Sequence, residues 1–244
     1  MSGKDKPSKK KEVFSLSIKV GIIDSHFVFT TIYKKDFMKH IVITRCKFGK
    51  EEDFQKYFEV MKKTYIPSIN SQTDKNFSIA LIVNPRHYDL IRNEINKEIE
   101  VIPFSDTKKD YKEYVINNNI TIQTRHDCDD IMESNYIETI RKLYNENNSK
   151  YDDFILNFHP TKLVVNTGKE YTHGRDYSKV CSMFSTLIQK SVKHGIMDCM
   201  HDFLEGFTRN IIYIPRGYVK LGIHGNNTTS KLRPEDKPLN ETIF

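Results

Sequence analysis

Strand-like and helix-like segments alternate through the first half of the sequence. Residues 40–45, 77–83 and 99–104 are nearly continuous apolar runs, as expected of buried parallel strands. Between them, residues 54–65 carry apolar side chains at intervals of three and four, and residues 88–97 form a second helical segment. Because strands that are separated by helices pair in parallel through right-handed crossovers, we predict an α/β domain with a mainly parallel central sheet flanked by helices.

The helix at residues 54–65 is predicted to end before Pro67, which cannot continue it. Its apolar stripe is assigned to core packing and comprises Phe54, Tyr57, Phe58, Met61 and Tyr65. Residues 105–114 are predicted to be a polar connection. Ser134 is predicted to cap a further amphipathic helix.

Strands are also predicted outside this alternating region. Residues 13–33 alternate apolar and polar side chains in two pieces, which indicates a β-hairpin placed before the main fold. Residues 154–158 and 163–166 are predicted to form a small antiparallel addition to the sheet. Two later strands are predicted at residues 211–214 and 218–223.

A cluster of carboxylates follows the strand-like segment that contains Ile120 and Ile122. The cluster consists of Asp127, Asp129 and Asp130, and the next segment is helical, so we predict that it lies in a strand-to-helix loop. Carboxylates two residues apart at the end of a strand can converge on one hard cation and leave positions open for phosphate oxygens. In a chain with 29% charged residues, a solvated loop is the competing interpretation of an Asp-x-Asp triplet.

Other polar residues come at the ends of the neighbouring predicted strands. Thr44 and Arg45 end one strand, and Asn84 follows the next. Ligands of open α/β sheets bind at the carboxyl ends of the strands. We therefore expect these residues and the acidic cluster to share one edge of the sheet.

Two sequence phrases and the strand between them carry a family resemblance. PSINSQT at residues 67–73, the strand at residues 79–83 and TRHDCDD at residues 124–130 follow one another in order. Together they resemble the putative rhamnosyltransferase family of A-type glycosyltransferases, whose pattern is approximately Pro-Ser-(apolar)-x-x-Gln-Thr, a strand, and Thr-Arg-x-Asp-x-Asp-Asp. His126 and Cys128 stand where that family usually has an apolar and a small polar residue.

The resemblance implies a single GT-A-like domain that is a metal-dependent glycosyltransferase. It would move a sugar, such as rhamnose or another hexose, from a nucleoside diphosphate donor to a hydroxyl acceptor on a carbohydrate. The expected donor is a UDP- or dTDP-sugar, and the expected cofactor is Mn or Mg. Asp129 is the first expected metal ligand and His224, near the C-terminus, is a further one. Asp127 is expected to bind the metal, the ribose or a metal-bound water, and Asp130 to help them or to cap the loop.

The donor-binding residues that this resemblance implies are Thr44, Arg45, Asn84, Arg125 and Asp127. Arg45 is a candidate for the donor's base or diphosphate, with a surface ion pair as the alternative. Arg125 could hold Asp127 in place or reach the diphosphate, because its planar guanidinium suits both.

Asp202 is the candidate general base for the acceptor hydroxyl. This assignment follows from the resemblance to A-type glycosyltransferases. In that fold a carboxylate, a helix, a strand and a histidine follow one another in this order near the C-terminus. Asp198 and Glu205 are its rivals. A helix-capping role for Asp202 is the structural alternative.

The length of 244 residues suits one α/β domain of the larger kind. We expect a disordered basic tail at residues 1–12, a glycosyltransferase domain at residues 13–230 and a loosely held tail at residues 231–244. Within the domain, about residues 40–150 are expected to bind the nucleotide sugar, and about residues 151–230 the acceptor.

Two other classes of protein share features with this sequence. A net charge of +6, with lysines crowded near the N-terminus, favours a nucleic-acid-associated protein, including a viral glycosyltransferase of DNA bases. The three carboxylates argue against this class because they repel phosphates unless a metal intervenes. The acidic cluster also resembles the nucleophile motif of haloacid-dehalogenase-type phosphatases. That motif lies near the first strand, however, and here three predicted strands precede it.

Cysteine usage and hydropathy bear on the compartment. The four cysteines are scattered without a Cys-x-x-Cys pair, which indicates a reducing compartment. No apolar run approaches the ~18 residues of a membrane span, and no signal peptide is evident. We expect a cytoplasmic protein, or one of the host cytoplasm if the richness in Lys, Asn and Ile reflects a viral rather than a microbial genome.

Overall fold

The computed structural model separates the chain into two compact units, residues 1–38 and 39–244. It describes residues 14–23, 26–35, 39–46, 50–104, 108–172, 182–198, 206–224 and 232–239. The first unit contains the antiparallel hairpin of β1 (Phe14–Ile23) and β2 (His26–Lys35), paired along their whole length. The predicted N-terminal hairpin is therefore confirmed.

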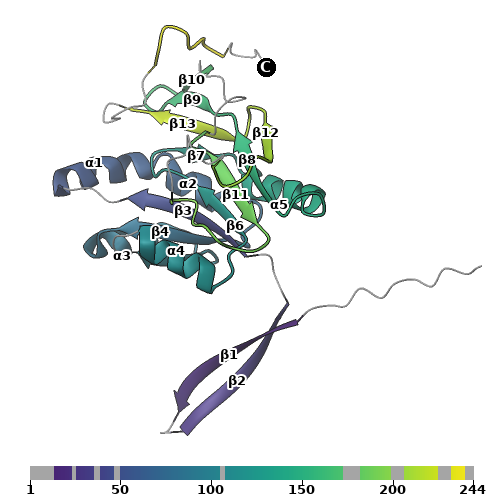
Figure 1. Ribbon diagram of the computed structural model, residues 1–244. Coiled ribbons are helices and arrows are strands. Elements are labelled where there is room, and N and C mark those ends of the chain that lie inside the picture. Colours follow the sequence, from purple (N-terminus) through teal and green to yellow (C-terminus); the bar gives the residue numbers. More distant parts are fainter. Residues whose placement is uncertain are drawn as a thin grey trace, which may run out of the picture. The chain divides into compact units, whose positions relative to one another are not determined.

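The second unit is built on a seven-stranded sheet (Figure 1). In sheet order the strands are β12 (Ile211–Ile214), β8 (Asp153–Phe158), β11 (Ser185–Gln189), β6 (Ile122–Arg125), β3 (His40–Cys46), β4 (Ser78–Val83) and β5 (Glu100–Phe104). Neighbours from β6 to β5 are parallel, as are β12 and β8, and only β11 runs antiparallel to both of its neighbours. The prediction of a mainly parallel α/β sheet is confirmed.

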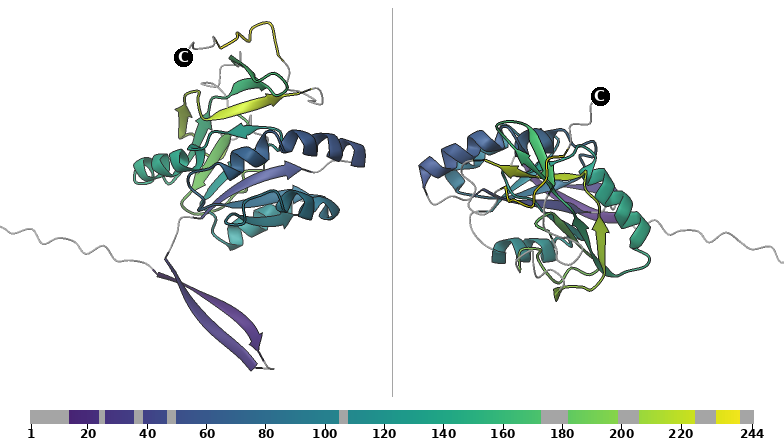
Figure 2. Two further views of the ribbon diagram at one scale, coloured as in Figure 1. Left: turned by 180° about the vertical axis from the view of Figure 1, so that it is seen from behind. Right: turned by 90° about the horizontal axis from the view of Figure 1, so that it is seen from above.

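Helices cover both faces of this sheet. Those described are α1 (Glu51–Met61), α2 (Tyr65–Asn70), the 3-10 helix η1 (Pro85–His87), α3 (Tyr88–Arg92), α4 (Lys108–Asn117) and α5 (Tyr136–Asn147). Ile43 of β3 packs in one core cluster with Tyr111 and Val115 of α4. The next residue, Thr44, faces the other side, where its buried hydroxyl donates a hydrogen bond to the Tyr65 hydroxyl of α2. Figure 2 shows α1 and α4 on opposite sides of the sheet.

A smaller four-stranded sheet lies against the carboxyl end of β6. Its order is β10 (Lys169–Thr172), β9 (Thr161–Val164), β13 (Val219–Ile223) and β7 (Ile131–Met132). The predicted antiparallel pairing of the segments at residues 154–158 and 163–166 is wrong. The first segment is β8, whose two edges are taken by β11 and β12, so the second, β9, pairs instead with β10 and β13.

Three local predictions also need correction. The helix predicted at residues 54–65 is two helices, and Pro67 lies in the first turn of α2, where a missing N–H leaves no helical hydrogen bond unmade. The stretch at residues 105–114 contains the start of α4, whose buried Tyr111 and Val115 have the charged Lys112 and Glu113 between them. The N-cap of α5 is Asn135 rather than Ser134, whose carbonyl oxygen accepts the Thr73 N–H.

The C-terminal segment at residues 232–239 is held to the smaller sheet. Asp236 Oδ2 pairs with the buried Nζ of Lys162 at 2.6 Å, and Pro238 forms a β-bridge with Tyr171. The prediction of a loosely held tail is therefore wrong for these residues. Among the described residues, no helix is long and apolar enough to cross a membrane.

Candidate active site

The three carboxylates lie in the turn between β6 and β7, which we call the acidic turn (residues 126–130). The turn begins where the parallel β3–β6 ladder ends, since the His126 N–H still donates to the Ile43 carbonyl oxygen at 3.0 Å. Sequence analysis predicted a strand-to-helix loop. The structure has the two-residue strand β7 before helix α5, and β7 ties the turn to the smaller sheet.

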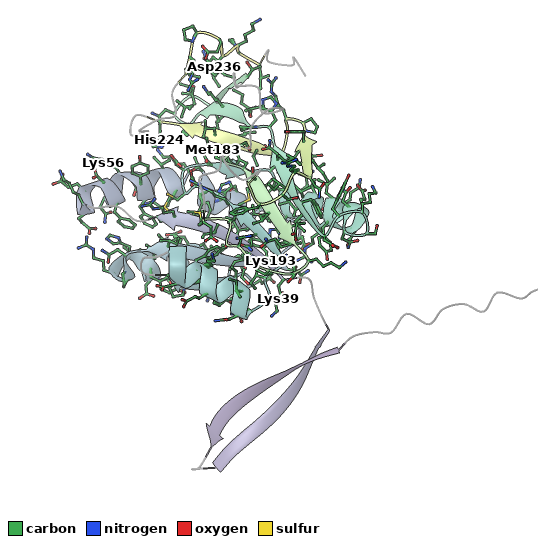
Figure 3. All side chains as sticks on the ribbon, viewed as in Figure 1. Lys39, Lys56, Met183, Lys193, His224 and Asp236 are labelled. Carbon is green, nitrogen blue, oxygen red and sulfur yellow. The ribbon has the colours of Figure 1, made fainter. Side chains whose placement is uncertain are left out.

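The acidic turn contacts the end of β13 through Asp129 and His224. His224 Nε2 lies 3.0 Å from Asp129 Oδ2, which is hydrogen-bonding distance, although the residues are 95 positions apart. The His224 side chain is 3% exposed and that of Asp129 is 19% exposed. The structure thus brings together the two residues that sequence analysis ranked first as metal ligands, and Figure 3 labels His224.

Tyr57 of α1 also contacts the His224 imidazole. Its ring meets the His224 ring edge-on, at 5.4 Å between centroids and 88° between planes. Burial raises the pKa of the Tyr57 hydroxyl, and the Asp129 carboxylate raises it further. Sequence analysis assigned Tyr57 to core packing together with Phe54. Its phenolic hydroxyl, which only Tyr65 shares within the stripe, was the one sign that Tyr57 differs from the apolar members.

The carboxylate of Asp127 lies near Arg125. Arg125 Nε lies 3.7 Å from Asp127 Oδ1, and the Asp127 side chain is 37% exposed. Arg125 therefore lies close enough to hold Asp127, one of its two predicted roles. Within the described ranges, no three or more His, Cys, Asp or Glu side chains are grouped as a metal site.

Asp130 is buried, unlike its two acidic neighbours. One of its oxygens, Oδ1, accepts the Gly222 N–H at 2.9 Å, and the other is buried without a hydrogen-bond partner among the described residues. Burial raises the pKa of Asp130 well above its usual range, and the nearby Asp129 and Asp127 carboxylates raise it further. Of the two predicted roles for Asp130, its contact with Gly222 favours holding the loop.

Buried side chains pack beneath the acidic turn. The His126 ring lies between Tyr65 and Phe184, at 5.6 and 5.7 Å between centroids, and burial lowers its pKa to about 4. Cys128 and Cys46 are free and buried, and a hydrogen bond between their thiols together with burial raises the pKa of Cys128. Buried aromatic and thiol side chains therefore support the turn from below.

The remaining donor-binding candidates have different surroundings. Thr44 is fully buried and its hydroxyl is used by Tyr65, so it does not face solvent. Arg45 is exposed at the end of β3. Asn84 follows β4 and its side-chain oxygen accepts the Arg86 N–H at 3.3 Å, which caps η1.

Gln72 and Thr73, from the first sequence phrase, connect α2 to the segment after the acidic turn. Gln72 Nε2 donates to the Glu133 carbonyl oxygen at 2.8 Å, and its Oε1 accepts the Ile137 N–H at the start of α5. The Thr73 N–H donates to the Ser134 carbonyl oxygen at 2.8 Å. The end of the first phrase is therefore bonded to the segment that follows the second phrase. The sequence pattern alone does not predict this role of Gln72 and Thr73.

The candidate bases can be placed only in part. Asp202 and Glu205 lie outside the described residues. Asp198 is 2.7 Å from Lys112 Nζ, and the same oxygen accepts the Gly195 N–H at 3.3 Å. These contacts fix the Asp198 carboxylate against α4 and the turn at Gly195.

One family model matches this chain. A family model described as "Putative rhamnosyl transferase" matches residues 44–236, which include the acidic turn and His224. A search of curated proteins found no significant match.

Three solved structures show a limited similarity to this chain. TarS of S. aureus is 11% identical with a TM-score of 0.47, covering 76% of this chain and 37% of that one. TarS 1-349 in complex with UDP-GlcNAc is also 11% identical, with a TM-score of 0.45 and coverage of 80% and 62%. A cytidylyltransferase from Leptospira borgpetersenii is 11% identical with a TM-score of 0.46, covering 73% and 76%. The chain thus spans less than two thirds of these TarS chains.

Proposed function

This chain belongs to the putative rhamnosyl transferase family, and from that membership we propose that it is a glycosyltransferase. It transfers a sugar, rhamnose or another hexose, from a nucleoside diphosphate donor to a hydroxyl group of a carbohydrate acceptor. The observation that carries the proposal is the contact between Asp129 and His224 at the end of the central sheet. In open α/β sheets this is the edge where ligands bind.

The residues present suit Mn or Mg. The site offers a carboxylate from Asp129, an imidazole nitrogen from His224 and a more exposed carboxylate from Asp127. Oxygen donors with one imidazole match the preferences of these ions. Asp129 and His224 would hold the metal, and Asp127 would contact it or the donor ribose. A bound metal would offset the negative charge that builds on the leaving diphosphate.

Other residues bind and orient the donor. Arg45, exposed at the end of β3, is available to the base or the diphosphate. Arg125, near Asp127, suits a phosphate through its planar guanidinium. Asn84 lies at the end of the next strand. UDP- and dTDP-sugars are the proposed donors.

A thermal-shift screen of nucleotides tests this function. Uridine, thymidine and guanosine diphosphates are each added with and without Mn. At least one is expected to raise the melting temperature in a manner that requires the metal, because a ligand that binds only the folded state stabilises it. If none does so, the proposed function loses its main support.

Asp202 is our proposed general base. The proposal rests on the order of carboxylate, helix, strand and histidine that the family resemblance implies. A base takes the acceptor proton in the transition state, so Asp202→Asn is expected to lower turnover by roughly 100-fold or more with donor affinity nearly unchanged. If Asp202 only caps a helix, asparagine replaces it well and turnover stays near normal. The latter result would move the assignment to Asp198 or Glu205.

A further inference from the structure

The acidic turn and β13 are joined at a second point, one residue beyond Asp129 and two residues before His224. There, Asp130 Oδ1 accepts the Gly222 N–H at 2.9 Å. The Asp130 side chain is buried, and Gly222 lies in the buried part of β13. The two links are therefore next to each other in both segments.

Asp130 accepts a hydrogen bond from β13 just beyond the point where the backbone pairing of β7 and β13 ends. The antiparallel register pairs Val219 with Met132 and then Lys220 with Ile131, where it ends. The next N–H of β13 on that side is that of Gly222, because alternate residues of a strand point their N–H groups to the same neighbour. The Asp130 carboxylate supplies the acceptor that a backbone carbonyl would otherwise provide.

Gly222 permits the close approach that this link requires. A Cβ atom at this position would clash with the Asp129 carbonyl oxygen, a backbone atom that a side-chain rotation cannot move away. The backbone of β13 therefore packs directly on the acidic turn. Any residue larger than glycine would push the two segments apart.

We propose that Asp130 is a positioning residue that fixes β13 against the acidic turn, at the spacing that places His224 beside Asp129. It acts through its bond to Gly222 and does not itself contact the donor or the metal. The effect on metal binding rests on the proposed function. The link to β13 does not depend on it.

The test compares Asp130→Ala with Asp130→Asn. Alanine removes the acceptor of the Gly222 N–H, whereas asparagine keeps an oxygen in its place. We expect Asp130→Ala to weaken Mn-dependent binding of the nucleoside diphosphate by about 10- to 100-fold, the range found when a residue that supports a metal ligand is lost. Asp130→Asn is expected to bind within a few-fold of the unchanged protein. Calorimetric titration of Mn in the presence of the nucleotide measures both.

Two further variants control for general destabilisation. Asn70→Ala also removes a side-chain oxygen that accepts a backbone N–H, but that N–H belongs to Asn96, between α3 and β5, rather than to the acidic turn or β13. It should leave Mn-dependent binding unchanged. Gly222→Ala should reproduce the loss seen in Asp130→Ala, because it separates the same two segments.

Hydrogen exchange of the Gly222 amide tests the link without any ligand. Exchange should be about 10-fold faster in Asp130→Ala and nearly unchanged in Asp130→Asn, as expected for the loss of one buried hydrogen bond. If the unchanged protein binds no nucleotide with Mn, the proposed function fails, but this measurement still tests the link. Unchanged exchange and affinity in Asp130→Ala would overturn the positioning role. So would a loss of Mn-dependent binding in Asp130→Asn as large as that in Asp130→Ala, since it would make Asp130 a ligand.

Discussion

Two pairs of polar side chains join distant segments to the smaller sheet, and they differ in exposure. Lys162 of β9 and Asp236 are 2.6 Å apart, and their side chains are 2% and 1% exposed. His224 after β13 and Asp129 are 3.0 Å apart, but the Asp129 side chain is 19% exposed. Figure 3 labels one member of each pair, His224 and Asp236.

The difference in exposure separates a structural pair from a candidate binding pair. Lys162 and Asp236 are shielded from solvent, and the second partner of Asp236 Oδ2 is the Arg233 N–H of its own segment. Asp129 keeps part of its surface open to solvent, as does Asp127, whose side chain is 37% exposed. We infer that removing a member of the first pair costs stability, and that removing a member of the second costs ligand binding.

The largest expected effect is on the buried pair. Asp236→Ala leaves the Lys162 ammonium buried without its carboxylate, so the free energy of unfolding should fall by about 3–5 kcal/mol. Chemical denaturation measures the change. The double variant Lys162→Met with Asp236→Leu removes both charges of this pair and should recover most of the loss. A single variant within about 1 kcal/mol of the unchanged protein would show that the pair is not structural.

The next effect is on ligand binding at Asp129. Asp129→Asn should weaken Mn-dependent nucleotide binding on the order of 100-fold or more, because a direct metal ligand should cost at least as much as a residue that supports one. The free energy of unfolding should change by no more than about 1 kcal/mol, because the carboxylate is partly solvated. Full metal-dependent affinity in this variant would contradict the assignment of Asp129 as a ligand.

His224→Ala should have a smaller effect on the same binding, about 10-fold, because Asp129 and Asp127 remain to hold the cation. The same titration of Mn with nucleotide measures it. A loss as large as that of Asp129→Asn would make the two residues equal partners. If the variant binds Mn and nucleotide as tightly as the unchanged protein, His224 only supports Asp129 and is not itself a metal ligand.

The smallest effect concerns a buried histidine outside both pairs. Burial, aided by the nearby Arg141 charge, lowers the pKa of His40 to about 3 from 6.5. The unfolded chain therefore binds a proton that the folded chain does not, and the stability from His40 is complete above pH 6.5 and is lost as the pH falls toward 3. His40→Gln should reduce the slope of unfolding free energy between pH 6 and 4.5 by about 1.4 kcal/mol per pH unit.

A matched control for His40→Gln is His194→Gln, whose side chain is 41% exposed. Denaturant titrations at several pH values measure the slope for both variants. If both variants have the original slope, His40 does not contribute to the acid sensitivity of the fold.

The sequence by itself determined the features that are encoded by local periodicity. The N-terminal hairpin follows from a spacing of two residues and α1 from spacings of three to four, whereas β3 and β4 follow from nearly continuous apolar runs. Connection handedness then placed the ends of β3, β4 and β6 at one edge of the sheet. This was enough to predict that Arg45, Asn84 and the acidic turn follow neighbouring strands.

Only the tertiary structure decided the contacts between segments that are far apart in the chain. Asp130 reaches Gly222 over 92 positions, and Lys162 reaches Asp236 over 74. The periodicity of the sequence did not show that both edges of β8 are occupied, which leaves none for β9. It also did not show that Asp130 is buried whereas Asp127 and Asp129 are partly exposed. The physical reason is that burial and hydrogen bonding depend on which strand edge is available and on how closely two backbones approach, and these are properties of the assembled sheets rather than of any one segment.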